Sequence, residues 1–466
     1  MNFRSELPHL PLKPPFVLRA RLMSALTGGG LFFEPDGVIS VDAAGRISGI
    51  SAARSYSGAT TPIDVRPLVI CPGLIDTHAH LPQMPLTGTS APGALMDWLE
   101  KEMAPAERRF AGGGSLRAAE SYLQIFASVG TTTVTLYSSV DAEATDAGFR
   151  AAAAHGIRIV LGQCLMDRMR YDDAPEAGIT DRRLAESESL CRRWHGYDNG
   201  RLQYAFTPRF ALSCSPQLLR ESARLASGMN AYWQTHVAED PEEMALVLAS
   251  FPEARNYLDI YDQAGGLGSK SILAHGVHLS DSEISRVLET HTTIAHCPSN
   301  VFGIGGVLDL GRYRGLGVTL GLGSDVGGCT DVSLFKAMEI GWICQASRKK
   351  LVPSSTVLTD VVGWFELATL GGARVLGLAD RIGSLEVGKE ADLIAVDADR
   401  LHVTSDNHQE AGLNVLCLMV FRARQDMIRG AWVRGQRLSG PGMFDAGQDV
   451  AQSGLQVKNQ TGQMSR

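Results

Sequence analysis

The sequence predicts an α/β fold, a (β/α)8 TIM barrel that carries a small β-sandwich domain built from both ends of the chain. Two observations lead to this prediction. In the middle of the chain, apolar runs of strand length alternate with helical stretches, which is the pattern of repeated βα units. At both ends, short strand-like pieces with alternating apolar residues are separated by Gly and Pro.

The apolar runs number eight, which is the strand number of a closed (β/α)8 barrel. They lie at 68–76, 131–137, 157–164, 202–206, 231–236, 271–275, 292–296 and 317–323. Helical segments such as 115–129, 216–226 and 281–289 lie between them. Since the chemistry of such a barrel sits at the C-terminal ends of its strands, polar candidates are expected directly after the runs.

The strand-like pieces at the two ends are expected to pair in one sheet domain. They lie at 16–21, 37–42 and 46–50 before the barrel, and at 383–397 and 425–437 after it. The chain therefore divides into four predicted parts. These are the N-terminal part of the β-sandwich domain (1–71), the barrel (72–378), the C-terminal part of the β-sandwich domain (379–440) and a flexible tail (441–466) rich in Gly, Gln and Ser.

Composition excludes several classes of protein. With 43 Lys and Arg against 50 Asp and Glu, the net charge is −7 and no basic run occurs, so no nucleic-acid partner is expected. The chain has no apolar stretch of about 18 residues, and 1–15 lacks the apolar core of a signal peptide, so no membrane association is expected. The eight cysteines form no C-x-x-C pair and are interpreted as reduced thiols of a cytoplasmic protein.

Ionisable residues do follow four of the runs. The first is followed by His78 and His80, whose side chains point the same way along a strand and can bind one divalent cation. His236 ends the fifth run, His275 ends the sixth, and Asp325 follows the eighth. Imidazoles and a carboxylate that meet at one rim form a nitrogen and oxygen ligand set suited to zinc, with one position left open for water.

A carboxylate beside this set would complete the chemistry of a hydrolase. A bound metal lowers the pKa of its water to about 7. Glu239 stands three residues after His236 and is not needed as a ligand, so it is placed to shuttle protons.

Other histidines and cysteines have simpler interpretations. We expect ordinary surface or core roles for His9, His155, His195, His291, His402 and His408, an outward orientation for His278 and a structural hydrogen bond for His296. Cys214 and Cys297 lie near the rim, but activated water makes a thiol nucleophile unnecessary. The combined H-x-E and P-C-x-x-C pattern that is typical of one class of zinc enzymes is absent.

Longer motifs give the chain a family resemblance over about 72–397. It resembles the amidohydrolase superfamily and, within it, the guanine deaminase family. The matching stretches are PGLIDTHAHLPQ (72–83), LMDWLEKEMAPAERRF (95–110), GTTTVTLY (130–137), TPRFALSCS (207–215), QTHVAED (234–240), LAHGVHLSDSEI (273–284), IAHCPSN (294–300), GLGSDVGG (321–328), LATLGGARVLGL (367–378) and GSLEVGKEADLIAVD (383–397). The metal motifs are shared across the superfamily, whereas Gln83, TPRF and PAERRF narrow the resemblance to guanine deaminases.

The resemblance implies one Zn2+ per subunit, bound by His78, His80, His236 and Asp325. Relatives with two metals bridge them through a carboxylated lysine at the end of the fourth strand, where this chain has Thr-Pro-Arg-Phe at 207–210. A mononuclear site follows from that difference.

The resemblance also implies roles in catalysis and substrate binding. Glu239 would move a proton from the attacking water to a purine ring nitrogen, Asp325 would help to deprotonate that water, and His275 would orient it. Gln83 and Arg209 would hydrogen-bond the purine and Phe210 would pack on its ring, with Arg209 as a rim salt bridge the alternative. The implied reaction converts guanine and water to xanthine and ammonia, in a homodimer.

Two alternatives stay open at this point. The same barrel and metal could act on another ring, such as 8-oxoguanine, a pterin or a triazine, because the loops at 299–310 and 326–335 depart from the family pattern. A catalytically silent scaffold barrel is the second alternative, although such a barrel is expected to lose metal ligands and this chain keeps all of them.

Overall fold

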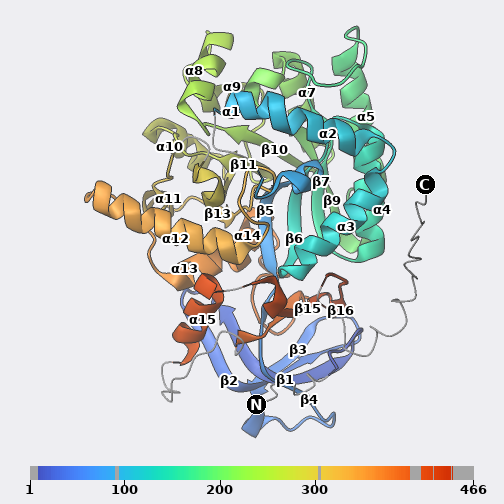
Figure 1. The fold of residues 1–466 in the computed structure, drawn as a ribbon, viewed down its shortest axis with the longest axis vertical. Helices are drawn as coiled ribbons and strands as arrows, with labels where there is room; N and C mark the ends of the chain where they lie inside the picture. The colour runs from blue at the N-terminus through green and yellow to red at the C-terminus, as the bar shows by residue number, and fades with distance from the viewer. Residues whose placement is uncertain are drawn as a thin grey trace, which may run out of the picture.

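The computed structural model describes residues 9–89, 94–302, 306–398, 411–422, 424–441 and 443. It has two parts, a barrel of strands covered by helices and a smaller sheet domain packed against one end of the barrel (Figure 1). Among these residues, no helix combines the length and the apolar character that crossing a membrane requires.

Eight parallel strands of the described residues form the barrel, which confirms the predicted fold class. They are β5 (Leu74–His80), β6 (Thr131–Tyr137), β7 (Arg158–Gly162), β9 (Leu202–Pro208), β10 (Tyr232–Val237), β11 (Ser271–His275), β12 (Thr293–His296) and β13 (Leu320–Leu322). Each pairs with the next in this order, and β13 lies beside β5, so the ring is nearly closed. The short strand β8 (Cys164–Leu165) pairs with β9 outside this path.

The first predicted run, 68–76, is not one barrel strand, and that part of the prediction is wrong. Its first half belongs to β4 (Ile63–Pro72) of the small sheet, and its second half begins β5 of the barrel. Gly73 lies between the two strands. Only glycine fits at this position, because a Cβ atom there would lie 2.0 Å from the side-chain oxygen of Thr132. The apolar run is therefore shared by two sheets, and only β5 carries the histidines.

Helices cover the outside of the barrel, and the predicted segments 115–129, 216–226 and 281–289 are helical. The longer ones are α3 (Ser115–Ser128), α4 (Ala142–His155), α5 (Ile179–Trp194), α7 (Pro216–Gly228), α8 (Pro241–Ser250), α10 (Asp281–Glu289) and α12 (Leu334–Leu351). Shorter ones are α1 (Leu95–Trp98), α2 (Ala104–Ala111), α6 (Tyr197–Gly200), α9 (Tyr257–Gln263), α11 (Leu310–Leu316), α13 (Val361–Glu366) and α14 (Gly372–Val375). Serine caps start two of them, since Ser215 accepts the N–H of Leu218 and Ser280 accepts that of Glu283.

Both ends of the chain build the small sheet, as predicted. Its strands are β1 (Phe16–Ala25), β2 (Leu31–Val41), β3 (Ile47–Ala52), β4, β14 (Leu393–Val396), β15 (Ile428–Val433) and β16 (Gln436–Arg437), in the order β16-β15-β14-β4-β1-β2-β3. The rings of Phe16 and Trp432 lie 6.3 Å apart although β4 and β14 separate their strands, so the sheet curves over its own core. Helix α15 (Ala411–Arg422) packs beside it (Figure 1).

Strand β4 connects the two cores, because its side chains alternate between them. Leu68 and Ile70 join the core of the small sheet, whereas Val69 and Cys71 join the core of the barrel. The predicted domain limits stay a prediction. The predicted tail at 441–466 lies outside the described residues except for 441 and 443.

Candidate metal centre and substrate pocket

The C-terminal rim of the barrel brings the predicted metal ligands together. His78 and His80 end β5, His236 lies near the end of β10, His275 ends β11, and Asp325 follows β13. Ligand atoms of His78, His236 and His275 lie within 4.8 Å of one another, and so do those of His78, His80 and Asp325. All five side chains are buried, so one cation could be enclosed by the set.

Hydrogen bonds outside the set orient these side chains. His236 Nδ1 lies 2.7 Å from the carbonyl oxygen of Arg209, so Nδ1–H donates there and Nε2 faces the other ligands. The Asp76 carboxylate accepts the backbone N–H of His78 at 3.2 Å and that of Ser324 at 3.0 Å, as well as the Ser324 hydroxyl at 2.5 Å. The ends of β5 and β13 are thus held by one buried acceptor.

The protonation states suit a cation. Burial lowers the pKa of His80 to about 4 and that of His275 to about 3, and it lowers the pKa of His236 well below its usual range. Burial alone would raise the pKa of Asp325, but its close contacts with His78 and His80 outweigh burial and hold that pKa well below its ordinary value. Neutral imidazoles and an ionised carboxylate are the forms that ligate a metal.

Three imidazole nitrogens of the set also lack hydrogen-bond partners, namely Nε2 of His78, Nδ1 of His80 and Nε2 of His275. Carboxylate oxygens of Asp325 and Glu239 lie 3.2 Å from the first and 3.4 Å from the last. A buried polar nitrogen without a partner is costly, and a cation bound between these side chains would satisfy it. The donor set therefore fits a bound divalent metal.

Glu239 lies beside the set, where the sequence places a proton shuttle. Burial, and then the charge of Asp325, raise its pKa well above that of an ordinary glutamate. Asn300 donates from Nδ2 to Glu239 Oε1 at 3.1 Å and also to Asp325 Oδ2, so it bridges the two carboxylates. Sequence reasoning missed Asn300, and its only signal was the motif IAHCPSN.

The predicted substrate-binding residues meet at a second carboxylate. Gln83, on the turn that follows β5, donates from Nε2 to Glu107 Oε1 at 2.7 Å, and Arg209 donates from Nη1 to the same oxygen at 2.8 Å. Arg209 thus forms an ion pair with Glu107. This ion pair is buried, because Glu107 is completely buried. Glu107 was missed as a site residue, although it lies in the PAERRF motif on α2. Phe210 is buried beside Arg209, directly after β9.

Most other histidines take no part in this cluster. His155 Nε2 hydrogen-bonds the carbonyl of Ser439, and His195 Nδ1 accepts the N–H of Tyr204. His296 ends β12 with its ring 6.0 Å from that of Trp364, and burial lowers its pKa to about 3. The structural hydrogen bond expected of His296 is not seen at Nε2, which is buried without a partner. His402 and His408 lie outside the described residues.

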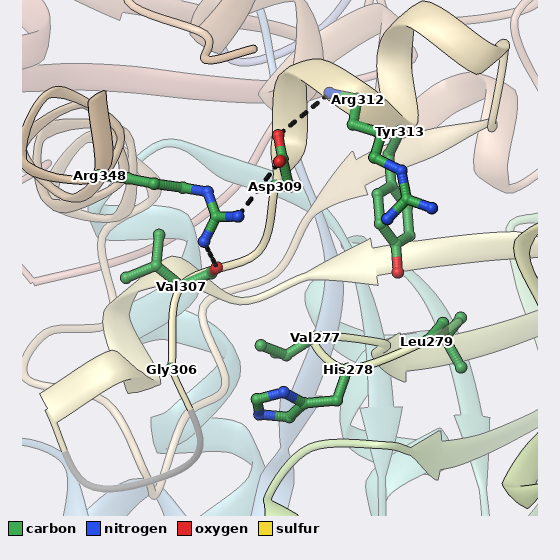
Figure 2. A pocket seen from close by; sticks show the side chains of 9 residues that line it. All are labelled: Val277, His278, Leu279, Gly306, Val307, Asp309, Arg312, Tyr313 and Arg348. Carbon is green, nitrogen blue, oxygen red and sulfur yellow. Dashed lines mark hydrogen bonds and ion pairs between the residues drawn. The ribbon is translucent and has the colours of Figure 1, made fainter. Parts of the chain in front are cut away.

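A separate pocket of about 370 Å³ opens next to the rim (Figure 2). His278, three residues after His275, lines it together with Arg312 and Arg348. Arg348 donates to the carboxylate of Asp309 and to the carbonyl of Val307. None of the predicted site residues lines this pocket.

The sequence and the structure were compared with those of known proteins, and both comparisons found relatives over most of the chain. The profile described as "Amidohydrolase family" matches residues 69–438. The chain is 34% identical to a probable guanine deaminase of Deinococcus radiodurans over 93% of this chain and 97% of the relative. It is 34% identical to the guanine deaminase of Escherichia coli over 72% of this chain and 74% of the relative. The crystal structure of guanine deaminase from Bradyrhizobium japonicum superposes with a TM-score of 0.82 and 26% identity, covering 91% of this chain and 99% of that one.

Proposed function

The chain belongs to the amidohydrolase family, and we propose that it hydrolyses guanine to xanthine and ammonia. The observation that carries this proposal is the position of two buried clusters side by side. The carbonyl oxygen of Arg209 accepts a hydrogen bond from the metal-ligand candidate His236. The guanidinium of Arg209 donates to Glu107, which also accepts from Gln83. Arg209 therefore links a candidate hydrolytic centre to a set of groups that can hydrogen-bond a polar ring.

We propose that the metal is zinc, one ion per chain, held by His78, His80, His236 and Asp325. The buried, unpartnered imidazole nitrogens and the ionised carboxylate support this assignment. When bound, such a cation supplies water activation, because it lowers the pKa of water to about 7.

The residues of the chain would carry the protons. His275 would orient the water that attacks the carbon bearing the amino group, and Glu239 would take one proton of that water and deliver it to the adjacent ring nitrogen. Asp325 would take the second proton from the hydroxyl formed on that carbon and pass it to the amino group. The C–N bond then breaks, the hydroxyl oxygen becomes the carbonyl of xanthine, and ammonia leaves. The raised pKa of Glu239 supports this role, since a carboxyl group must hold a proton near neutral pH to deliver it.

Substrate binding would rest on Gln83, Arg209 and Phe210. The pKa of Arg209 is raised because Glu107 outweighs the effect of burial, so its guanidinium stays charged and offers several N–H donors. Phe210, buried beside Arg209, would cover one face of the purine.

The subunit arrangement and the cellular location stay predictions of the same proposal. All eight cysteines are free thiols, which supports a cytoplasmic protein. A homodimer is expected, and light scattering coupled to gel filtration would test it.

An ammonia-release screen tests the proposed activity. The purified enzyme would be assayed with guanine, 8-oxoguanine, a pterin and a triazine, before and after chelation and zinc addition. Release from guanine that zinc restores supports the proposal. Release from another ring alone would favour the related-deaminase alternative, and no release from any ring would favour the silent scaffold.

A further inference from the structure

Glu107 lies between Gln83 and Arg209, the two residues proposed to hydrogen-bond the purine. Its Oε1 accepts from Gln83 Nε2 and from Arg209 Nη1, and its Oε2 accepts from the Tyr171 hydroxyl. It is completely buried on α2, so these contacts are not shared with solvent. Gln83 and Arg209 therefore both donate to the same buried carboxylate oxygen.

A carboxylate can only accept, and this determines how the amide of Gln83 is turned. Reversing that amide would place its oxygen 2.7 Å from Glu107 Oε1, where two acceptors repel. The NH2 group must face Glu107, and the carbonyl Oε1 must point elsewhere. Glu107 thus fixes the direction of Gln83 Oε1 and leaves this carbonyl oxygen as the acceptor that a ligand can meet, while the amide keeps one further N–H.

The free acceptor of Gln83 lies near the segment that carries Asp325. Gln83 Oε1 is buried and has no hydrogen-bond partner. It lies against Gly327, two residues after Asp325, so closely that a Cβ atom at that glycine would be 2.2 Å from it. An unpaired buried acceptor is costly, which indicates that a ligand N–H satisfies it.

Arg209 supplies the opposite polarity. One of its N–H groups is used on Glu107, and a guanidinium has no acceptor, so every other contact with a ligand is a donation. The Arg209 carbonyl holds His236, which places this donor group at a set position relative to the metal ligands. The pocket therefore presents one acceptor and one donor from neighbouring side chains.

We propose that Glu107 is a positioning residue that makes the pocket specific for a lactam edge, an N–H beside a C=O. This rests on the proposed function, because guanine has that edge at N1–H and C6=O. Gln83 would accept from N1–H while Arg209 donates to the C6 oxygen. Since N1 adjoins the carbon that carries the amino group, these contacts also turn that carbon toward the metal ligands.

The wild-type enzyme alone can test the proposal. 2,6-Diaminopurine has the same 2-amino group as guanine, but its edge is an amidine, with a bare N1 and an amino group at C6. We expect kcat/KM to be about 10⁴-fold higher for guanine, the scale for a site whose buried hydrogen-bonding groups lose their partners. Comparable kcat/KM values for the two purines would overturn the proposal.

Two variants at Glu107 separate positioning from a structural role. Glu107→Met removes the acceptor, so the amide of Gln83 can reverse and the preference for guanine over 2,6-diaminopurine should collapse by roughly 10² or more. Glu107→Gln still offers a carbonyl oxygen to both donors and should keep most of the preference at a lower rate. A merely structural role predicts that both variants lower the melting temperature and both activities, with the ratio between substrates unchanged.

The outcomes also separate this inference from the proposed function. If the wild type releases no ammonia from guanine, both fail. If it deaminates guanine but Glu107→Met keeps the wild-type preference, only the inference fails. If Glu107→Met does not fold, the wild-type comparison of the two purines decides.

Discussion

The backbone N–H of Asp325 donates to the carbonyl oxygen of His78 across 2.9 Å. This bond joins the segment after the last barrel strand to the first strand, at two of the candidate metal ligands. Asp76 reinforces the junction by accepting from His78 and Ser324. The position where the barrel closes is thus also the position where its metal site is built.

Substituting any one of the proposed metal ligands should remove both the metal and the activity. Replacing His78, His80, His236 or Asp325 by Ala should remove or loosen the ion and abolish turnover, because each leaves the set short of a ligand. Elemental analysis of the purified proteins measures this, with His291→Ala at an exposed position as the control. Active wild-type enzyme without a stoichiometric transition metal would contradict the mechanism.

Glu239→Gln should separate chemistry from binding. The amide keeps the shape and can still accept from Asn300, but it cannot carry a proton, so the rate should fall by about 10² to 10⁴. Metal content and the affinity for guanine should change far less. Steady-state kinetics with metal analysis decides, and a wild-type rate would rule out the proton shuttle.

Arg209→Ala should weaken guanine turnover more than that of other substrates. The expected loss in kcat/KM for guanine is roughly 1.5 to 3 kcal/mol or more, the scale of a charged hydrogen bond. The melting temperature should also fall, because Glu107 is left buried without its cation. An equal loss on guanine and on a second purine would instead make Arg209 purely structural.

Asp76→Ala should loosen the junction without touching the substrate. Ala has no side-chain acceptor, so the backbone N–H groups of His78 and Ser324 would be left buried without a partner. We expect a stability loss of about 1 to 3 kcal/mol and a metal affinity about 10- to 100-fold weaker. Urea unfolding and competition with a chelator measure the two effects. Ser324→Ala, which removes only the hydroxyl contact, should show a smaller change.

Arg158 should show a pH-dependent contribution to stability. It begins β7 and forms buried ion pairs with Glu390 at 2.6 Å and with Asp392 at 3.0 Å, which join the barrel to the small sheet. Burial alone would raise the pKa of Glu390, but Arg158, Arg434 and Arg381 lower it from 4.5 to about 2. The stabilisation is therefore complete above pH 4.5 and is lost as the pH falls toward 2.

Arg158→Met is the corresponding test. At neutral pH it should cost about 3 to 5 kcal/mol, the penalty for removing one partner of a buried pair. The difference in unfolding free energy between wild type and variant should shrink as the pH falls below 4.5. A difference that stays constant between pH 7 and pH 3 would show that the stabilisation by Arg158 does not depend on the ionised Glu390 carboxylate.

The barrel and the candidate metal ligands could be predicted because both follow from local order along the chain. Apolar runs of strand length, separated by helical segments, imply parallel strands, and parallel strands in a barrel end at one rim. Residues at or just after the ends of those runs must then meet, as His78, His236 and His275 do. The positions of these residues relative to the ends of the apolar runs are therefore enough to predict that they meet.

The break at Gly73 and the roles of Glu107 and Asn300 depended on the tertiary structure. The run at 68–76 is continuously apolar because both sheets bury it, so hydrophobicity alone does not show where one sheet ends. Glu107 lies on a helix after the first strand and meets Arg209, 102 positions away, only because α2 folds over the rim. A single polar residue has no periodicity, so its partner is decided by packing between distant segments rather than by the order of residues around it.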